Sequence, residues 1–298
     1  MRFMFLDIIK WKNLLYFIAI QFLLKTCLLY YQGFETIFSF PNFFILTISV
    51  VLILAGMNTI KFSVSHENRG KEYPWQKLRK TAYFSIFFGL TLWVLVSFVV
   101  DRAYYSFIGI ALVFFLFIYF YFFGGKKSLS TNMITSFIKA FCFLTVWWMD
   151  TPVGLNESEW NLFFKIQLLV VFYVSIGFIA TIVNSLLMDI INIDKDYRLN
   201  HKTIPILFGR KRVKSIIFFI SIIGCLAVLS LAILFSSNKY IFTTVFLTGI
   251  LPELYFIYHL LAANSNSDYQ KLLKKSYVAY ALAIFSVPII AYYFKNVV

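Results

Sequence analysis

Two aspartates and an asparagine between positions 189 and 196 have the spacing of a magnesium site. Asp189, Asn192 and Asp196 stand at i, i+3 and i+7, so on a helix they share one face. Carboxylate and amide oxygens are hard ligands, and Mg²⁺ is typically held by one or two carboxylates together with phosphate oxygens of a substrate. We therefore predict that these three residues bind Mg²⁺ and that Asp189 and Asp196 are catalytic. Asp194 points elsewhere on a continuous helix and contributes only if the helix breaks there.

Basic side chains follow these acids directly and suit the binding of a diphosphate. They are Lys195, Arg198, Lys202, Arg210, Lys211 and Arg212. A metal that bridges phosphate oxygens, with bases that neutralise the remaining charge, would form a diphosphate cradle. Arg198 and Lys202 are the substrate-binding candidates of this group. The distal cluster from Arg210 to Lys214 has an alternative reading, because hydrated basic loops are routine on the cytoplasmic side of membrane proteins.

The composition of the chain indicates that the fold which holds these residues is embedded in a membrane. Of its 298 residues, 61% are hydrophobic and 13% are charged, whereas a soluble domain carries roughly 25% charged residues. The apolar residues fall in runs of about twenty, the length that crosses a hydrocarbon core. Nine such runs are found, at 13–32, 42–61, 81–100, 103–123, 130–149, 165–188, 214–235, 240–261 and 276–294. The sequence excludes a soluble protein and predicts a single polytopic, all-helical membrane domain over 1–298.

The positions of lysine and arginine predict the orientation of the nine spans. Nearly all the basic residues outside the spans fall on the face that holds the N-terminus, and the other face holds Arg102, Lys239 and Lys295. Because cytoplasmic loops are enriched in Lys and Arg, we expect the N-terminus in the cytoplasm and the C-terminus outside, in the inner (plasma) membrane. This asymmetry accounts for the net charge of +14 without a nucleic-acid partner. The three cysteines lie in apolar spans without CxxC spacing, which disfavours a zinc site or a disulfide framework.

The acid-rich segment resembles the second aspartate motif of the UbiA-type membrane prenyltransferases. That motif has the form DxxDxxxD, and a threonine-leucine-proline step and a glycine follow it. The matching residues here are Asp189, Asn192 and Asp196, then Thr203-Ile204-Pro205 and Gly209, with Asn192 in place of the usual central aspartate. The family fold has nine helices with one aspartate motif after helix two and one after helix six. The nine predicted spans match that plan over nearly the whole chain.

Two further segments relate the chain to the family, one by likeness and one by departure. The glycine-lysine turn at 124–127 resembles a basic turn of the family and makes Lys127 a substrate-binding candidate. The family's first motif, NDxxDxxxD, corresponds to 58–66, where Asn58 is kept as a further substrate-binding candidate. The three carboxylate positions of that motif hold Thr59, Phe62 and His66. Their loss should weaken a second Mg²⁺ site, unless the nearby Glu67 and Glu72 substitute for them.

The resemblance implies a Mg²⁺-dependent enzyme that moves an isoprenyl group from a prenyl diphosphate to a lipophilic acceptor. Spans two to five and six to nine would form two four-helix halves around a cavity open to the bilayer, with span one outside. Two alternatives stay open. One is a catalytically impaired relative that serves as a membrane binding or assembly subunit. The other is a transporter, which would show inverted repeats and broken helices at the midplane; the sparse Pro and Gly give little sign of these.

Overall fold

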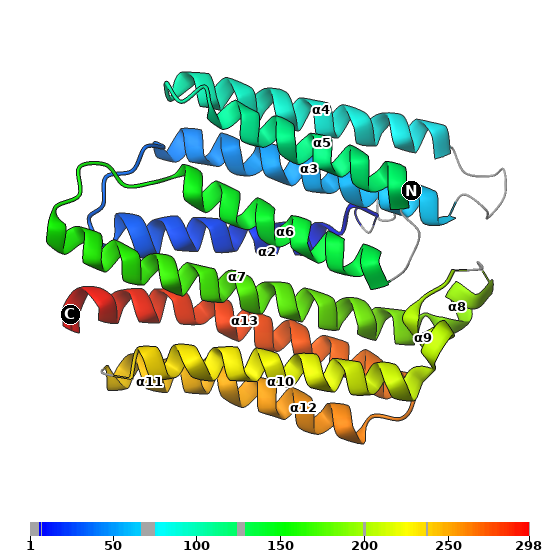
Figure 1. The fold of residues 1–298 in the computed structure, drawn as a ribbon. Helices are drawn as coiled ribbons and strands as arrows, with labels where there is room; N and C mark the ends of the chain where they lie inside the picture. The colour runs from blue at the N-terminus through cyan, green and yellow to red at the C-terminus, as the bar shows by residue number, and fades with distance from the viewer. Residues whose placement is uncertain are drawn as a thin grey trace. The chain divides into compact units, whose positions relative to one another are not determined.

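The computed structural model describes residues 6, 8–66, 75–123, 129–198, 201–236 and 238–297, and within these ranges helices joined by short connections make up the fold. The helices, labelled in Figure 1, are α2 (Trp11–Leu23), α3 (Phe40–His66), α4 (Trp75–Val99), α5 (Tyr105–Phe123), α6 (Leu129–Met149), α7 (Glu157–Ile191), α8 (Ile193–Arg198), α9 (Ile204–Phe208), α10 (Arg210–Leu234), α11 (Lys239–Val245), α12 (Leu251–Ala262) and α13 (Asn266–Val297). Two π-helical turns continue these elements, Leu24–Tyr30 after α2 and Phe246–Ile250 between α11 and α12.

Each of the nine predicted spans corresponds to one continuous helical stretch. Eight of these stretches are long and apolar enough to cross a membrane, and α5 is apolar over the shorter stretch Tyr105–Phe120. The eighth span is built from α11, the π-helical turn and α12 together. The prediction of an all-helical, multi-pass membrane protein is therefore confirmed.

Helix α7 begins well before its predicted span, 165–188, because its polar first turn is capped. The side chain of Asn156 accepts a hydrogen bond from the backbone N–H of Glu159. The side chain of Glu159 in turn accepts from the backbone N–H of Asn156 at 2.8 Å. This reciprocal pair is a capping box, which satisfies backbone donors that would otherwise be unpaired. Hydropathy alone missed it, because the residues that form it are polar.

The chain divides into two compact units. The first comprises 1–22, 36–127 and 142–153, and the second comprises 23–35, 128–141 and 154–298. The predicted grouping of spans holds in outline, since α3, α4 and α5 belong to the first unit and α7 to α13 belong to the second. The first span and α6 are each divided between the units. The single domain expected over 1–298 stays a prediction.

In the first unit, two glycines allow α3 and α4 to pack with their backbones close together. A Cβ atom added at Gly89 would lie 2.7 Å from the carbonyl oxygen of Ser49, and one added at Gly56 would lie 2.5 Å from a side-chain carbon of Ile86. Small residues of this kind are typical of close helix pairs in membranes, where dispersion contacts replace the hydrophobic effect. Any larger side chain must displace the neighbouring helix.

In the second unit, α7, α10, α12 and α13 lie side by side around an apolar core (Figure 1). At the end where α7 meets α8, the core consists of fully or almost fully buried side chains, including Leu186, Leu187, Ile190, Val213, Ile217 and Leu260. Lys214 at the start of α10 donates hydrogen bonds to the carbonyl oxygens of Leu261 (2.8 Å) and Ala263 (2.7 Å) at the end of α12. These bonds join α10 to α12, and the core packs both helices against the end of α7 that carries the predicted site.

Replacement of Gly89 by alanine is expected to destabilise the protein by about 1–3 kcal/mol, because the added methyl group overpacks against the backbone of α3. The measurement is denaturant or thermal unfolding of the full-length protein in detergent, followed by tryptophan fluorescence. Gly177→Ala on α7 is the matched control, since no atom lies within 4 Å of its added Cβ and alanine favours a helix over glycine. Equal losses in the two variants would contradict the packing argument.

Candidate active site

The junction of α7 and α8 keeps the two predicted catalytic aspartates on one side of the chain. Asn192 lies between the helices with φ −97° and ψ 14°. Its N–H donates to the carbonyl oxygen of Met188 at 3.0 Å, and its own carbonyl oxygen accepts from the N–H of Asp196 at 2.9 Å. Helical hydrogen bonding therefore continues through the junction. Asp189 and Asp196, seven residues apart, lie on the same face as they would on one helix.

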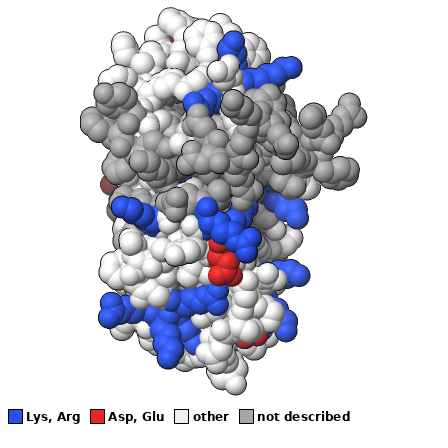
Figure 2. All heavy atoms as spheres, turned by 90° about the vertical axis from the view of Figure 1, so that its right-hand side faces the viewer, with Lys and Arg blue, Asp and Glu red and all other residues white. Residues whose placement is uncertain are grey.

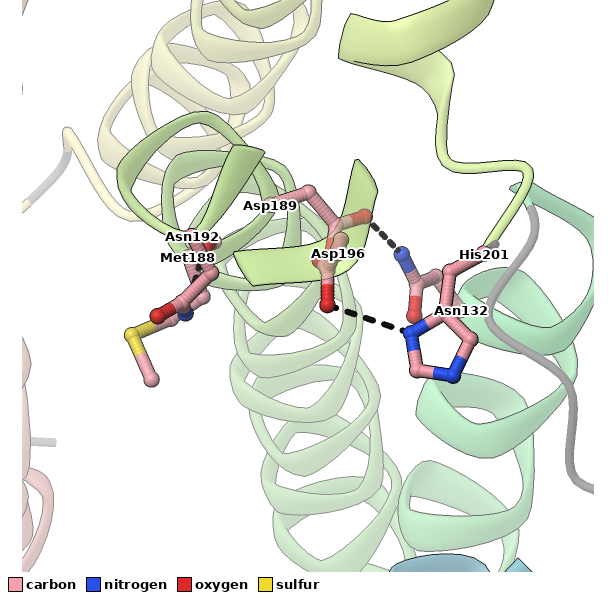
Figure 3. A network of polar contacts seen from close by, with 6 residues as sticks. All are labelled: Asn132, Met188, Asp189, Asn192, Asp196 and His201. Atoms are coloured by element: carbon pink, nitrogen blue, oxygen red, sulfur yellow. Dashed lines mark hydrogen bonds and ion pairs between the residues drawn. The ribbon is translucent and has the colours of Figure 1, made fainter. Parts of the chain in front are cut away.

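Both aspartates are buried, with exposed fractions of 5% for Asp189 and 0% for Asp196. Asn132, on α6, donates from Nδ2 to Oδ2 of Asp189 at 2.8 Å. His201, which follows α8, has its Nδ1 3.2 Å from Oδ1 of Asp196. Figure 3 shows the two carboxylates turned to the same side, toward Asn132 and His201. Because a buried carboxylate is costly unless it is hydrogen-bonded, this arrangement is a built feature and not a solvated loop.

Asn132 and His201 were missed by the sequence prediction. Both are polar residues next to segments that the sequence had singled out. Asn132 stands at the start of the predicted fifth span, and His201 stands between the acids and Thr203. No local pattern joins Asn132 to Asp189, because the contact depends on how α6 and α7 pack. Each of these residues holds a carboxylate in position, and neither was among the predicted ligands.

Asn192 lies differently from the two aspartates. Its Nδ2 donates to the carbonyl oxygen of Met188 at 2.8 Å, and Figure 3 shows its side chain beside Met188, away from the carboxylates. The exposed Asp194 has a side chain that is 80% accessible and lies 3.9 Å from Arg210. The role of Asn192 as a ligand stays a prediction, while the amide that contacts a site carboxylate in the structure belongs to Asn132.

The predicted basic residues lie at the polar end of the second unit. Arg198 and Lys202 are exposed, and lysine and arginine side chains gather on the face that Figure 2 shows. Thr203, at the start of α9, is fully buried, and its Oγ1 has no hydrogen-bond partner among the described residues. Lys214, in contrast, donates both of its described hydrogen bonds to carbonyl oxygens at the end of α12, so it has a structural role that neither reading of the distal basic cluster predicted.

The segment equivalent to the first motif has no described carboxylate, and its polar side chains bind within the first unit. Asn58 donates from Nδ2 to the carbonyl oxygen of Ile9 at 3.0 Å, and Thr59 donates to the carbonyl oxygen of Ala55 at 2.8 Å. Phe62 packs with its ring 6.3 Å from that of Trp75. The substrate-binding role of Asn58 stays a prediction. Four further predicted features lie outside the described residues, namely Lys127, Glu67, Glu72 and the side chain of His66.

The donor set of the second unit fits one Mg²⁺ ion bound together with a phosphate. No group of three or more His, Cys, Asp or Glu side chains that could hold a metal occurs among the described residues. Two carboxylates are nevertheless what Mg²⁺ commonly takes from a protein, because substrate phosphates and water complete its octahedron. Asp189 and Asp196 are the residues that would hold it, and Asn132 and His201 would orient them.

Comparison with known proteins shows that the fold of this chain is similar to that of a solved structure. No protein-family model matches the chain, and no curated protein matches it. A solved structure described as "Structural and mechanistic insights into the biosynthesis of Digeranylgeranylglyceryl phosphate synthase in membranes" matches with a TM-score of 0.65 and 16% sequence identity, over 96% of this chain and 97% of that chain. That protein is a UbiA-type membrane prenyltransferase. The chain therefore has the fold of such an enzyme over nearly its full length.

Asn132→Ala is expected to lower the free energy of unfolding by about 1.5–3 kcal/mol, because Asp189 loses a hydrogen bond to a buried charge. The measurement is denaturant unfolding of the full-length protein in detergent without divalent cations. Asn192→Ala is the matched control, and it should cost less than about 1 kcal/mol because its amide bonds to a backbone carbonyl near the surface. A loss at Asn132 no larger than the loss at Asn192 would contradict the assigned contact.

Proposed function

We propose that the chain transfers an isoprenyl group from a prenyl diphosphate to a lipophilic acceptor within the bilayer, in a Mg²⁺-dependent reaction. One observation carries the proposal. Two buried carboxylates, Asp189 and Asp196, are turned to the same side at the polar end of α7, in a chain whose fold is that of a membrane prenyltransferase. A structural protein gains little from such a pair, because each buried carboxylate costs desolvation free energy.

The proposed reaction breaks the bond between the allylic carbon and the diphosphate oxygen. The diphosphate leaves with the electron pair, the acceptor forms the new bond to the allylic carbon, and the acceptor loses a proton. Bound Mg²⁺ would supply positive charge to the departing diphosphate. Asp189 and Asp196 hold the metal, and the exposed Arg198 and Lys202 donate charge-assisted hydrogen bonds to the phosphate oxygens. Asn132 and His201 keep the carboxylates in place through the contacts described above.

The segment around Asn58 limits this proposal to a single metal position. Thr59 and Phe62 occupy two of the places where a carboxylate would be needed for a second ion, and both are engaged with α3 or α4. Prenyl transfer with one metal then depends on basic residues for the remaining phosphate charge. A chain that binds the diphosphate without releasing it would instead be a binding or assembly subunit.

Asp189→Asn and Asp196→Asn are each expected to lower kcat/KM for prenyl transfer about a hundredfold or more, because each removes a carboxylate that holds charge at the leaving group. The assay follows release of diphosphate and formation of prenylated lipid from labelled prenyl diphosphates with Mg²⁺ and membrane lipids. Asp194→Asn is the matched control, since it changes an exposed aspartate of the same segment and should keep the activity. Retained activity in the Asp189 and Asp196 variants would refute the assignment, and no release by the unaltered chain with any prenyl diphosphate would favour the binding subunit.

We further propose that the site opens to the cytoplasm, with the N-terminus inside and the C-terminus outside the inner membrane, because the basic loops lie on the N-terminal side of the nine spans. In intact cells, Ser236→Cys between α10 and α11 should react with a membrane-impermeant thiol reagent. Asn264→Cys between α12 and α13 should react only after the cells are opened. Both positions are exposed, so the opposite pattern would reverse the proposed orientation.

A further inference from the structure

A second polar site lies inside the second unit, in the middle of the span formed by α11, the π-helical turn and α12. A partly open cavity of about 70 Å³ is lined by residues of α7, α10, this span and α13. Most of its lining is apolar, and Glu253 is the acidic residue in it. A carboxylate at this depth is expensive and marks a functional site by default. The prediction from sequence missed Glu253, although an acid within the run 240–261 was the available signal.

The backbone around Glu253 is interrupted in a way that suits a cavity wall. The π-helical turn Phe246–Ile250 precedes it, and Pro252, which has no N–H to donate, stands directly before it. Thr248 and Gly249 of the turn line the cavity. Irregular backbone at membrane depth is tolerated where it is covered by protein or lines a cavity, and π-helical turns are frequent at functional sites.

The carboxylate of Glu253 forms no ion pair with a Lys, Arg or His in the described part of the chain. Its neighbour on α10 is Ser221, which is fully buried next to it. Glu253, unlike Ser221, lines the cavity. It therefore offers a ligand a carboxyl group that has no basic partner in the described part of the chain.

The hydroxyl groups of the residues that line the cavity donate their protons within the protein. The bonds run from Tyr173 to Ser286 Oγ, from Ser286 to the carbonyl of Ala283 (2.6 Å), from Tyr280 to the carbonyl of Gly177 (3.2 Å), from Thr248 to the carbonyl of Thr244 (2.7 Å) and from Ser276 to Oδ1 of Asn184. The oxygens of these groups can therefore serve a ligand only as acceptors. Together with the carboxyl group of Glu253 they make the lining rich in acceptors, which favours a ligand that donates hydrogen bonds.

We infer that this cavity binds the ammonium head group of an apolar amine. An ammonium group supplies up to three donors and a positive charge that stabilises the ionised form of the Glu253 carboxyl group. The rings of Tyr173, Tyr280 and Phe256 in the wall suit cation–π contacts. An inorganic cation fits less well, because it needs about six oxygen ligands and the wall is mostly apolar. The inference does not depend on the proposed prenyl transfer, since none of the residues that carry it belongs to the site at Asp189 and Asp196.

Gly224 on α10 gives a way to close the cavity without removing its charge. A Cβ added there would lie 3.9 Å from Oε1 of Glu253 and 3.2 Å from a methyl carbon of Ile179. The two γ-methyl groups of valine would extend further into the space beside the carboxylate. Gly224→Val therefore tests the volume of the site, while Glu253→Gln tests its charge at nearly constant shape.

The experiment is isothermal titration of the full-length protein in an uncharged detergent with hexylammonium, corrected with a protein-free micelle blank. Hexanol and hexanoate test the need for positive charge, and ethanolamine tests whether the ammonium head suffices without the apolar chain. We expect saturable one-to-one binding of hexylammonium to the unaltered protein and to Glu157→Gln, which changes an exposed acid outside the cavity. Glu253→Gln and Gly224→Val should each bind it about tenfold more weakly or worse.

Three outcomes would overturn the assignment of the cavity to an ammonium group. The first is the absence of saturable binding to the unaltered protein. The second is equal affinity for hexanol and hexylammonium, and the third is undiminished binding by Glu253→Gln. Thermal unfolding of each variant checks that it is folded. If Gly224→Val does not fold, Glu253→Gln decides alone, because glutamine keeps the size and the hydrogen-bonding oxygen of glutamate. Binding of ethanolamine as tight as that of hexylammonium would assign the site to a free polar amine and contradict the apolar part of the inference.

Discussion

Burying two carboxylates at the end of a membrane helix has a desolvation cost that apolar packing does not offset. The carboxylates are stable there only if polar partners form hydrogen bonds with them. Asp189 and Asp196 meet this requirement with Asn132 from α6 and His201 from the segment after α8. The end of α7 that carries Asp189 is itself fixed by the apolar core to which Leu186, Leu187 and Ile190 belong. The arrangement of the polar end of the second unit follows from this one constraint.

The sequence predicted the spans well because the bilayer imposes a simple rule, about twenty apolar residues for each crossing. It predicted that Asp189 and Asp196 share one face, because helical hydrogen bonds continue through the junction at Asn192. It did not predict Asn132, whose contact with Asp189 joins two helices far apart in sequence. It also missed the early start of α7, because the capping box of Asn156 and Glu159 is polar. Hydropathy identifies apolar spans, but it does not predict contacts between distant helices or polar caps at helix ends.

Both sites for which we propose a function lie in the second unit, and α7 contributes residues to each. Asp189 stands at one end of α7, and Tyr173, Ala180 and Val183 of the same helix line the cavity that holds Glu253. In the first unit, the segment that corresponds to the first motif of the resembled family holds Thr59 and Phe62. Thr59 bonds to its own helix and the ring of Phe62 lies beside that of Trp75 on α4. The second unit thus holds both polar sites, and the first unit packs α3 closely against α4 around Gly56 and Gly89.

The number of divalent ions that bind with the substrate tests the central claim most directly. In a titration with Mn²⁺ followed by electron paramagnetic resonance, a non-reactive prenyl thiodiphosphate should induce the binding of one ion per chain. That ion should be lost when Asp189 and Asp196 are both replaced by asparagine. Two ions per chain would mean that a second set of ligands exists beyond these carboxylates. Binding that persists in the double variant would place the metal elsewhere and remove the physical basis of the proposed reaction.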